Sequence, residues 1–239
     1  MPRGYDGEMG SHFNEAGLKF LRGLKRHNER EWFNARKSVY ESELKAPMLA
    51  VIGEVNEALE AFAPEFVRDP AKIMMRIYRD TRFSKNKLPY KDHVAAWWAR
   101  RGMEKTSGGG FYLDVSPTQV MIAAGVYMPE REQLLAIRRH LVERHGEYRT
   151  ILAGKKLKAA GMEPIERAMM TRPPKGFDAG HPSTDLVMQR QWGVAGHLPA
   201  EVSMSGALVG EILKRFKLAS PLVSFLNEPL VSVVKAQLF

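Results

Sequence analysis

The sequence predicts a single α+β domain in which helices flank a central, mainly antiparallel sheet. Apolar residues recur at helical spacing in the first and last thirds of the chain, and segments that alternate every second residue lie between them. No repeat or low-complexity tract separates domains within the 239 residues. We therefore expect residues 12–239 to form one domain and residues 1–11 to be a loose N-terminus.

Three helical segments are predicted near the N-terminus. Residues 13–27 carry apolar side chains every three or four positions, which indicates a short amphipathic helix. Asn28 and Glu31 have the spacing of a capping box, in which Asn28 accepts a hydrogen bond from the first turn of a second helix. Pro47 fits the first turn of a third helix with an apolar stripe over residues 48–62, so the chain should kink or break there.

The middle of the chain alternates in the manner of β-strands. We interpret residues 72–80 as one strand. Residues 93–100 could form a second strand or a helical turn, and we favour the strand because they contain two adjacent tryptophans and Gly102 follows. Trp97 and Trp98 must face opposite ways in an extended segment, and we expect one of them to be exposed. Residues 111–126 contain two alternating stretches joined by a Ser-Pro turn, which predicts a β-hairpin.

Helical spacing returns after Pro129. Residues 172–181 contain two prolines and two glycines, so we expect an irregular loop there. A further helix is predicted over residues 208–216. A last helical segment should begin at Pro221 and be interrupted at Pro229, because proline disrupts a helix interior.

The positive charge of the chain is concentrated in one segment. Lys and Arg number 36 and Asp and Glu number 27, which gives a formal net charge of +9. Residues 76–91, the basic segment, contain six cationic side chains and one aspartate and so carry +5 of this charge. A local excess of this size favours an anionic partner.

Composition and motifs exclude several kinds of chemistry. The chain has no cysteine, which excludes disulfides, thiolate metal sites and a cysteine nucleophile. Its seven histidines form no HExxH motif and no pair at metal-ligand spacing, so we expect no metal site and no cofactor. No apolar run approaches the about 18 residues of a membrane span, and the opening residues lack the apolar stretch of a signal peptide. We therefore expect a cytoplasmic protein that does not contact a membrane.

The basic segment is the main candidate for a binding site. On a strand that continued through it, Arg76, Tyr78, Asp80 and Arg82 would project from the same face. Arginines bind carboxylate and phosphate groups through two parallel hydrogen bonds, and an aspartate between two of them can orient both. Tyr78 and Asp80 are candidates for acid or base catalysis. The alternative is that Asp80 and Arg82 form only an internal salt bridge.

The irregular loop supplies further candidates. Lys175, Asp178 and His181 bring a cation, an acid and a base within seven residues, and His181 is the third catalytic candidate. The expected anion-binding residues of both regions share a cationic side chain: Arg76, Arg79, Arg82, Lys85 and Lys175.

Three segments together resemble a known family. Residues 28–33, 76–91 and 175–182 are similar, in this order, to the uncharacterised bacterial family called domain of unknown function 2461. The resemblance implies one α+β unit over nearly the whole chain and supplies no activity, substrate or catalytic residues. The chain departs from the family pattern at Asn86 and Gly180, where an acid is usual, and at Leu88, where a hydroxyl residue is usual.

Three classes of function are compatible with these features. The first is binding, with or without turnover, of a small anionic or phosphorylated ligand, which we favour because Asp80 and Tyr78 lie among the arginines. The second is nucleic-acid binding through the same basic segment, with Tyr90 or an exposed tryptophan as a stacking surface. The third is an interaction module in which the arginines only brace the fold.

Overall fold

The computed structural model describes residues 11–82, 85–103, 108–165 and 169–237. Within these residues the predicted α+β class is confirmed. Of the N-terminus predicted to be loose, residues 1–10 lie outside the described part of the chain. The helical elements are α1 (Glu15–Arg26), α2 (Arg30–Asn34), α3 (Lys37–Tyr40), the π-helix η1 (Glu41–Lys45), α4 (Ala46–Leu59), the 3-10 helix η2 (Pro64–Phe66), α5 (Pro70–Ile73), α6 (Arg131–Leu152), α7 (Lys155–Ala159), α8 (Thr184–Val187), the 3-10 helix η3 (Ala200–Met204) and α9 (Leu208–Gln237).

One antiparallel sheet joins all the described strands, in the order β1-β2-β3-β4-β6-β5. The strands are β1 (Met74–Met75), β2 (Val94–Ala99), β3 (Gly110–Val115), β4 (Gln119–Val126), β5 (Glu163–Pro164) and β6 (Trp192–Pro199). The predicted hairpin is confirmed as β3 and β4, with Val115 opposite Val120. Ser116 closes its turn, because the serine hydroxyl accepts a hydrogen bond from the backbone N–H of Gln119 (3.1 Å).

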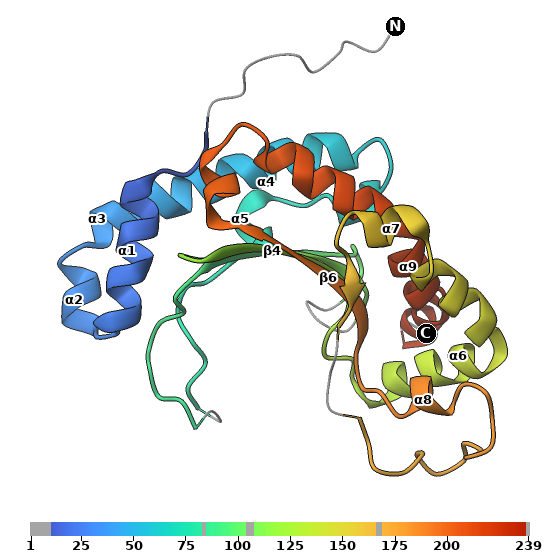
Figure 1. Ribbon diagram of the computed structural model, residues 1–239. Coiled ribbons are helices and arrows are strands. Elements are labelled where there is room, and N and C mark those ends of the chain that lie inside the picture. The colour runs from blue at the N-terminus through green and yellow to red at the C-terminus, as the bar shows by residue number, and fades with distance from the viewer. Residues whose placement is uncertain (1–10, 83–84, 104–107, 166–168, 238–239) are drawn as a thin grey trace, which may run out of the picture.

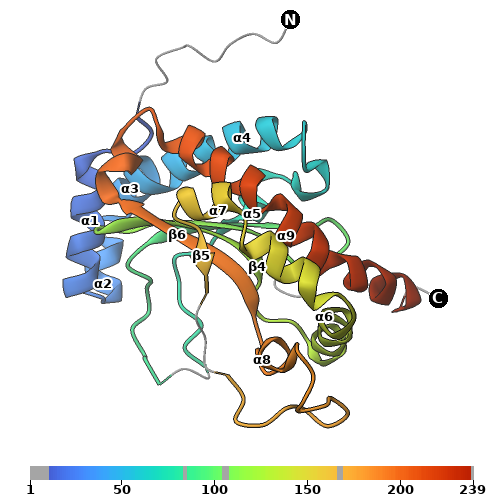
Figure 2. The ribbon, with the colours of Figure 1, turned by 45° about the vertical axis from the view of Figure 1, so that its right-hand side comes forward.

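The helices cover one face of the sheet. Figures 1 and 2 show α4, α5, α7 and α9 on the same side of the sheet, which arches beneath them. Two segments extend from the opposite side, one blue-green and one orange. The first contains the basic segment, residues 76–91, and the second contains residues 172–183. From here on we call the basic segment, residues 76–91, the basic hairpin, and we call residues 172–183 the pocket loop.

Side chains that point toward the helices form the hydrophobic core. Trp98 of β2 and Phe111 of β3 are fully buried against Phe216 of α9, with ring centroids 5.2 and 4.6 Å from that of Phe216. The indole N–H of Trp98 donates to the side-chain oxygen of Asn56 in α4 (3.1 Å). Removal of this apolar surface from water is the main force that holds the helices on the sheet.

The other face of the sheet carries Trp97, small residues and polar side chains such as Tyr112 and Asp114. The prediction that the two tryptophans face opposite ways is confirmed, but the expectation that one is exposed is wrong, because only 8% of Trp97 is accessible. Its ring lies over Gly110, where a Cβ atom would come within 2.9 Å of it. The glycine therefore leaves the space in which the tryptophan ring packs against the sheet.

The predicted capping box at Asn28 is wrong. Glu29 occupies the position before α2, and it makes no side-chain capping bond. The Asn28 side chain instead binds the backbone of Tyr90: its amide donates to the carbonyl (3.1 Å), and its oxygen accepts from the N–H (2.9 Å). The backbone of Tyr90, far away in sequence, thus binds both the donor and the acceptor of the Asn28 side chain. Asn28 therefore does not act as the helix cap that the local sequence predicts.

The chain also continues through Pro47 without a break. The helical path runs from α3 through η1 into α4, and the interruption lies earlier, at Ala35 and Arg36. Proline has no N–H to donate, and its ring clashes with the carbonyl of the fourth residue before it in an α-helix. The π-helical turn of η1 comes just before Pro47. Its backbone hydrogen bonds join residues five apart instead of four, which changes the α-helical bonding pattern ahead of the proline.

The strand predicted over residues 72–80 is reduced to the two residues of β1. Asp69 caps a helical turn there, because its carboxylate accepts from the N–H of Ala71 (2.8 Å) and Pro70 follows it. Beyond β1 the chain leaves the sheet and pairs with the returning part of the basic hairpin, through an isolated bridge between Tyr78 and Tyr90. The expected row of four polar side chains on one strand face is therefore wrong.

The separate last helix predicted to begin at Pro221 is also wrong. α9 runs without interruption from Leu208 to Gln237 and contains Pro221 and Pro229. Its side chains Leu222, Phe225 and Leu226 are at most 3% exposed. Their burial outweighs the backbone hydrogen bonds that the prolines remove, so tertiary packing overrides the local preference.

Candidate functional site

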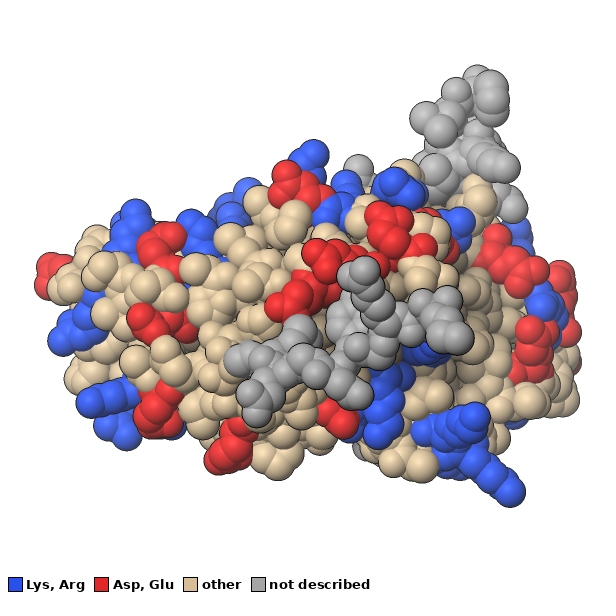
Figure 3. All heavy atoms as spheres, turned by 90° about the horizontal axis from the view of Figure 1, so that it is seen from above, with Lys and Arg blue, Asp and Glu red and all other residues tan. Residues whose placement is uncertain are grey.

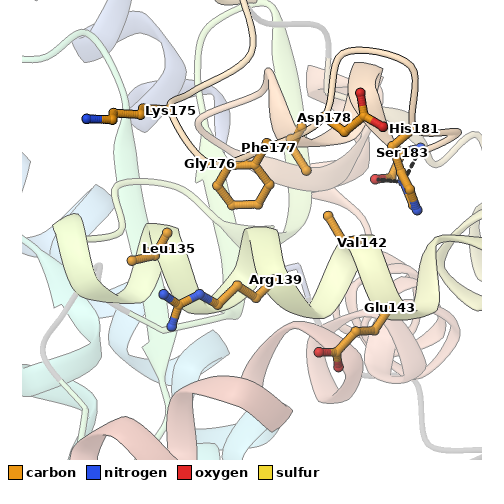
Figure 4. Close-up of a pocket in the computed structure, with 11 residues that line it drawn as sticks. Leu135, Arg139, Val142, Glu143, Lys175, Gly176, Phe177, Asp178, His181 and Ser183 are labelled. Carbon is orange, nitrogen blue, oxygen red and sulfur yellow. Dashed lines mark hydrogen bonds between the residues drawn. The ribbon is translucent and has the colours of Figure 1, made fainter.

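A pocket of about 380 Å³ lies between α6 and the pocket loop. The three residues of this loop that the sequence indicated, Lys175, Asp178 and His181, all line it. α6 contributes Arg139 and Glu143 to the opposite wall, as Figure 4 shows. The pocket thus brings together candidates from the irregular loop with side chains of α6 that the sequence did not indicate.

α6 presents one face to this pocket because of its helical spacing. The helix begins with a capping box, in which the side chain of Gln133 accepts from the N–H of Glu130 (2.8 Å) and Glu130 caps the first turn in return. Leu135, Arg139 and Val142 then recur at steps of four and three residues, so they share one face.

The pocket loop is irregular, as predicted, and is held by local hydrogen bonds. Asp178 accepts from the N–H of Gly180 (2.8 Å), which closes a turn within the loop. Arg149 of α6 donates to the carbonyl of Pro182 (3.0 Å) and to the carboxylate of Asp185 (2.7 Å). These bonds attach the end of the loop to the helix on the other side of the pocket.

His181 is oriented by Ser183, which is fully buried. Nδ1 of His181 lies 2.8 Å from the Ser183 hydroxyl and accepts from the Ser183 N–H (3.2 Å). A ring nitrogen that accepts a backbone hydrogen bond carries no proton, so the neutral ring keeps its proton on Nε2. His181 can therefore offer a hydrogen-bond donor at Nε2.

The charges of the pocket are divided between its two ends. In Figure 4, Arg139 and Lys175 lie at one end, Asp178, His181 and Glu143 lie toward the other, and the ring of Phe177 lies between them. Among the described residues, neither Arg139 nor Lys175 has an ion pair or hydrogen-bond partner. The cationic end thus has donors available for an anion, and the middle of the pocket is apolar.

The basic hairpin holds the other candidates, and these are exposed. Asp80 accepts two side-chain hydrogen bonds from Arg82, at 2.8 and 3.1 Å, and lies 3.9 Å from Arg76. The bonds from Arg82 lower the pKa of Asp80 to about 2. The side chains of Arg76 and Arg82 are 68% and 75% exposed. The internal salt bridge that we considered as the alternative is therefore present, on an open surface.

The base of the basic hairpin is rigidly packed. Phe33 of α2 stacks on Tyr90 with ring centroids 4.2 Å apart, and Tyr78 contacts both rings. Arg79 turns inward and donates from Nε to the carbonyl of Tyr90 (2.8 Å), the same carbonyl that Asn28 binds. Arg79 therefore braces the hairpin, whereas Tyr78, 48% exposed, remains accessible beside the charged residues.

Asn86 forms a turn within the basic hairpin. Asn86 accepts from the N–H of Leu88 (3.0 Å), a turn that either asparagine or aspartate can form. Leu88 is 45% exposed, and Lys85 is exposed beside this turn. Asn86 thus holds this turn with a neutral side chain.

A polar cluster that the sequence did not indicate lies on the open face of the sheet. Asp114 of β3 is only 7% exposed, and burial raises its pKa, opposed mainly by the nearby His93 and by Tyr112 and His197. Burial, assisted by the charge of Asp114, also raises the pKa of Tyr112. The alternation of β3 already puts Tyr112 and Asp114 on its polar face. The pairing of β4 with β3 and with β6 places His197 of β6 in line with Asp114 across the sheet. No local feature of the sequence predicts this pairing.

Within the described part of the chain, no group of three or more His, Asp or Glu side chains is arranged to hold a metal ion. The helices described there also include none with the length and apolar character to cross a bilayer.

The fold and the pocket define the class: an α+β protein with one antiparallel sheet, helices on one face and a charged pocket beside α6. The chain belongs to the family described as a conserved hypothetical protein (DUF2461), whose model matches residues 16–225. The resemblance seen in the sequence is thereby confirmed, and the match includes both the basic hairpin and the pocket loop. No curated protein and no solved structure matched the chain.

Proposed function

We propose that this protein binds a small anionic ligand, with a carboxylate or phosphate group, in the pocket between α6 and the pocket loop. The observation that carries this proposal is the pair of cations without partners among the described residues, Arg139 and Lys175, at one end of a pocket of about 380 Å³. Guanidinium and ammonium groups bind such anions through charge-assisted hydrogen bonds. The volume is within the range of small-molecule sites.

The rest of the pocket suits an organic body attached to the anionic group. Phe177, Leu135 and Val142 provide apolar contact beside the cationic end. At the other end, His181 offers its Nε2 proton and Asp178 offers an acceptor, so a hydroxyl or amide of the ligand has partners there. A phosphorylated or carboxylated metabolite with a polar far end matches this division.

Inorganic phosphate is the simplest probe of this site. At a concentration about tenfold above its Kd, phosphate should stabilise the protein by about 1.4 kcal/mol and raise Tm by roughly 3–5 °C, because it binds only the folded state. The measurement is a thermal melt against sodium chloride at equal ionic strength, since general salt effects must be matched.

Paired variants locate the site. The double variant Arg139→Gln/Lys175→Gln should lose the phosphate-dependent shift, and Arg82→Gln on the basic hairpin should keep it. An equal shift in the wild type and in the double variant contradicts the proposal. Loss of the shift in Arg82→Gln alone would move the anion site to the basic hairpin, where the sequence first indicated it.

Nucleic-acid binding by the basic hairpin is the second candidate. The observation that favours it is the exposure of Arg76, Arg82 and Tyr78 on a segment that extends from the open side of the sheet (Figure 1). Cations that contact phosphates and an aromatic ring that stacks on bases are the usual means of binding single strands.

Salt dependence tests this second candidate. A labelled single-stranded oligonucleotide should bind the wild type with a steep loss of affinity as salt increases. The variant Arg76→Gln/Lys87→Gln should reduce the slope of log K against log salt by about 0.7 for each phosphate contact removed. Arg139→Gln, outside the basic hairpin, is the matched control. No binding at low salt would exclude this function.

A further inference from the structure

A second cavity lies between α7 and α9. Its volume is about 390 Å³. Ala159, Ala160 and Leu218 form an apolar wall, and Ala160 and Leu218 are continuous with the hydrophobic core. The other lining residues are Lys156, Lys214 and Lys217, so the cavity combines an apolar wall with a rim of lysines.

The charge of this rim is not compensated within the described residues. None of the three lysines of the rim forms an ion pair or hydrogen bond there, in contrast to Lys45, which binds Glu41 (2.6 Å). The ammonium of Lys217 lies 5.9 Å from the ring centroid of Phe62, a contact that does not neutralise its charge. α7 adds two further lysines, at positions 155 and 158. Figure 3, which views the helical side of the molecule, shows Lys and Arg side chains gathered at the lower right. An anionic group at this rim would meet several cations and no competing carboxylate from the rim.

These two properties together select one kind of ligand. Inorganic phosphate or a nucleic acid would use the lysines and leave the apolar wall in water. A neutral hydrocarbon would contact the apolar wall but would have no favourable electrostatic interaction with the lysines. A molecule with an anionic head and one aliphatic chain uses both, because lysine side chains can lie along an apolar surface and extend their ammonium groups to its edge.

We propose that the groove between α7 and α9 binds a free single-chain amphiphile with an anionic headgroup. The aliphatic chain lies against Ala159, Ala160 and Leu218, and the headgroup is held by Lys156, Lys214 and Lys217. A cavity of about 390 Å³ suits one short chain. This site is independent of the pocket beside α6, with which it shares no lining residue.

A series of aliphatic carboxylates tests the proposal by calorimetry. Acetate, hexanoate, octanoate and decanoate, each kept below its micelle concentration, carry the same headgroup with increasing chain length. Affinity should increase by up to about fourfold for each buried CH₂ group, and acetate should not bind measurably. 1-Octanol, which matches octanoate in length but is neutral, should bind more weakly than octanoate.

Variants separate the head from the chain. Lys214→Gln/Lys217→Gln should weaken octanoate by about fivefold and leave 1-octanol unchanged, because two exposed ion pairs are lost. Leu218→Gln should weaken both ligands, and Lys25→Gln on α1 should weaken neither; melting curves show whether each variant is folded. Three results would each overturn the proposal. The first is equal affinity for all chain lengths, and the second is equal binding of octanoate by the wild type and the double lysine variant. The third is binding to phosphatidylglycerol vesicles without binding of free decanoate.

Discussion

Gly125→Ala will lower the free energy of unfolding by about 3 kcal/mol or more, the largest effect that we expect from any single substitution considered. Gly125 has a φ angle of 142°, which residues with a side chain rarely adopt. A Cβ atom there would lie 2.2 Å from the carbonyl oxygen of Trp192 and 2.5 Å from the Cα of Gly193. Both contacts are with the backbone of β6, so the sheet itself would have to move.

Gly53→Ala in α4 is the matched control. No atom lies within 4 Å of the Cβ that this change adds, and the glycine is in a helix interior. Alanine should therefore stabilise the protein by about 0.5–1 kcal/mol. Urea denaturation of both variants measures the difference. If Gly125→Ala were as stable as the wild type, the close approach of β4 and β6 at this point would be wrong.

Asn28→Ala and Asn28→Asp will both destabilise the protein, each by about 2–4 kcal/mol. Alanine removes two hydrogen bonds, at 3.1 and 2.9 Å, from the backbone of Tyr90. Aspartate can still accept from the N–H, but its second oxygen would face the Tyr90 carbonyl and put a charge where only 8% of the residue is accessible. A helix cap would tolerate this exchange, because both side chains accept equally well.

Asp69→Asn supplies the comparison for this prediction. Asp69 is exposed and caps α5 by accepting a hydrogen bond from the N–H of Ala71 (2.8 Å). Asparagine at this position should therefore change the free energy of unfolding of the protein little. Hydrogen exchange adds a second readout: in both Asn28 variants the amides of Arg79 and Lys91, which pair across the basic hairpin, should exchange faster. A neutral Asn28→Asp variant would restore the capping interpretation.

The elements that the sequence predicted correctly are those with a strong local signal. The hairpin of β3 and β4 combines period-two alternation with a serine-proline turn, and the irregular pocket loop contains two prolines and two glycines. β6 was missed because its glycines and small residues alternate weakly, and its position follows from pairing with β4, far away in sequence.

The same distinction applies to the candidate sites. The charge of the basic hairpin, and the presence of Lys175 and His181 in a short polar loop, can be read directly from the chain. That Arg139 lies at the same end of a pocket as Lys175 could not be inferred, since nothing in either segment encodes their approach. The strand predicted over residues 72–80 is likewise shorter than expected because Tyr78 pairs with Tyr90 instead of with the sheet. The local sequence does not predict this pairing.

By itself the sequence determined the α+β class, the concentration of positive charge in residues 76–91 and the absence of cysteine chemistry, because composition and short-range periodicity are properties of the chain. Only the tertiary structure decided that Asn28 binds Tyr90 instead of a helix end, and that α9 continues through Pro221. In both cases burial and long-range hydrogen bonds outweigh a local preference of about 1–3 kcal/mol.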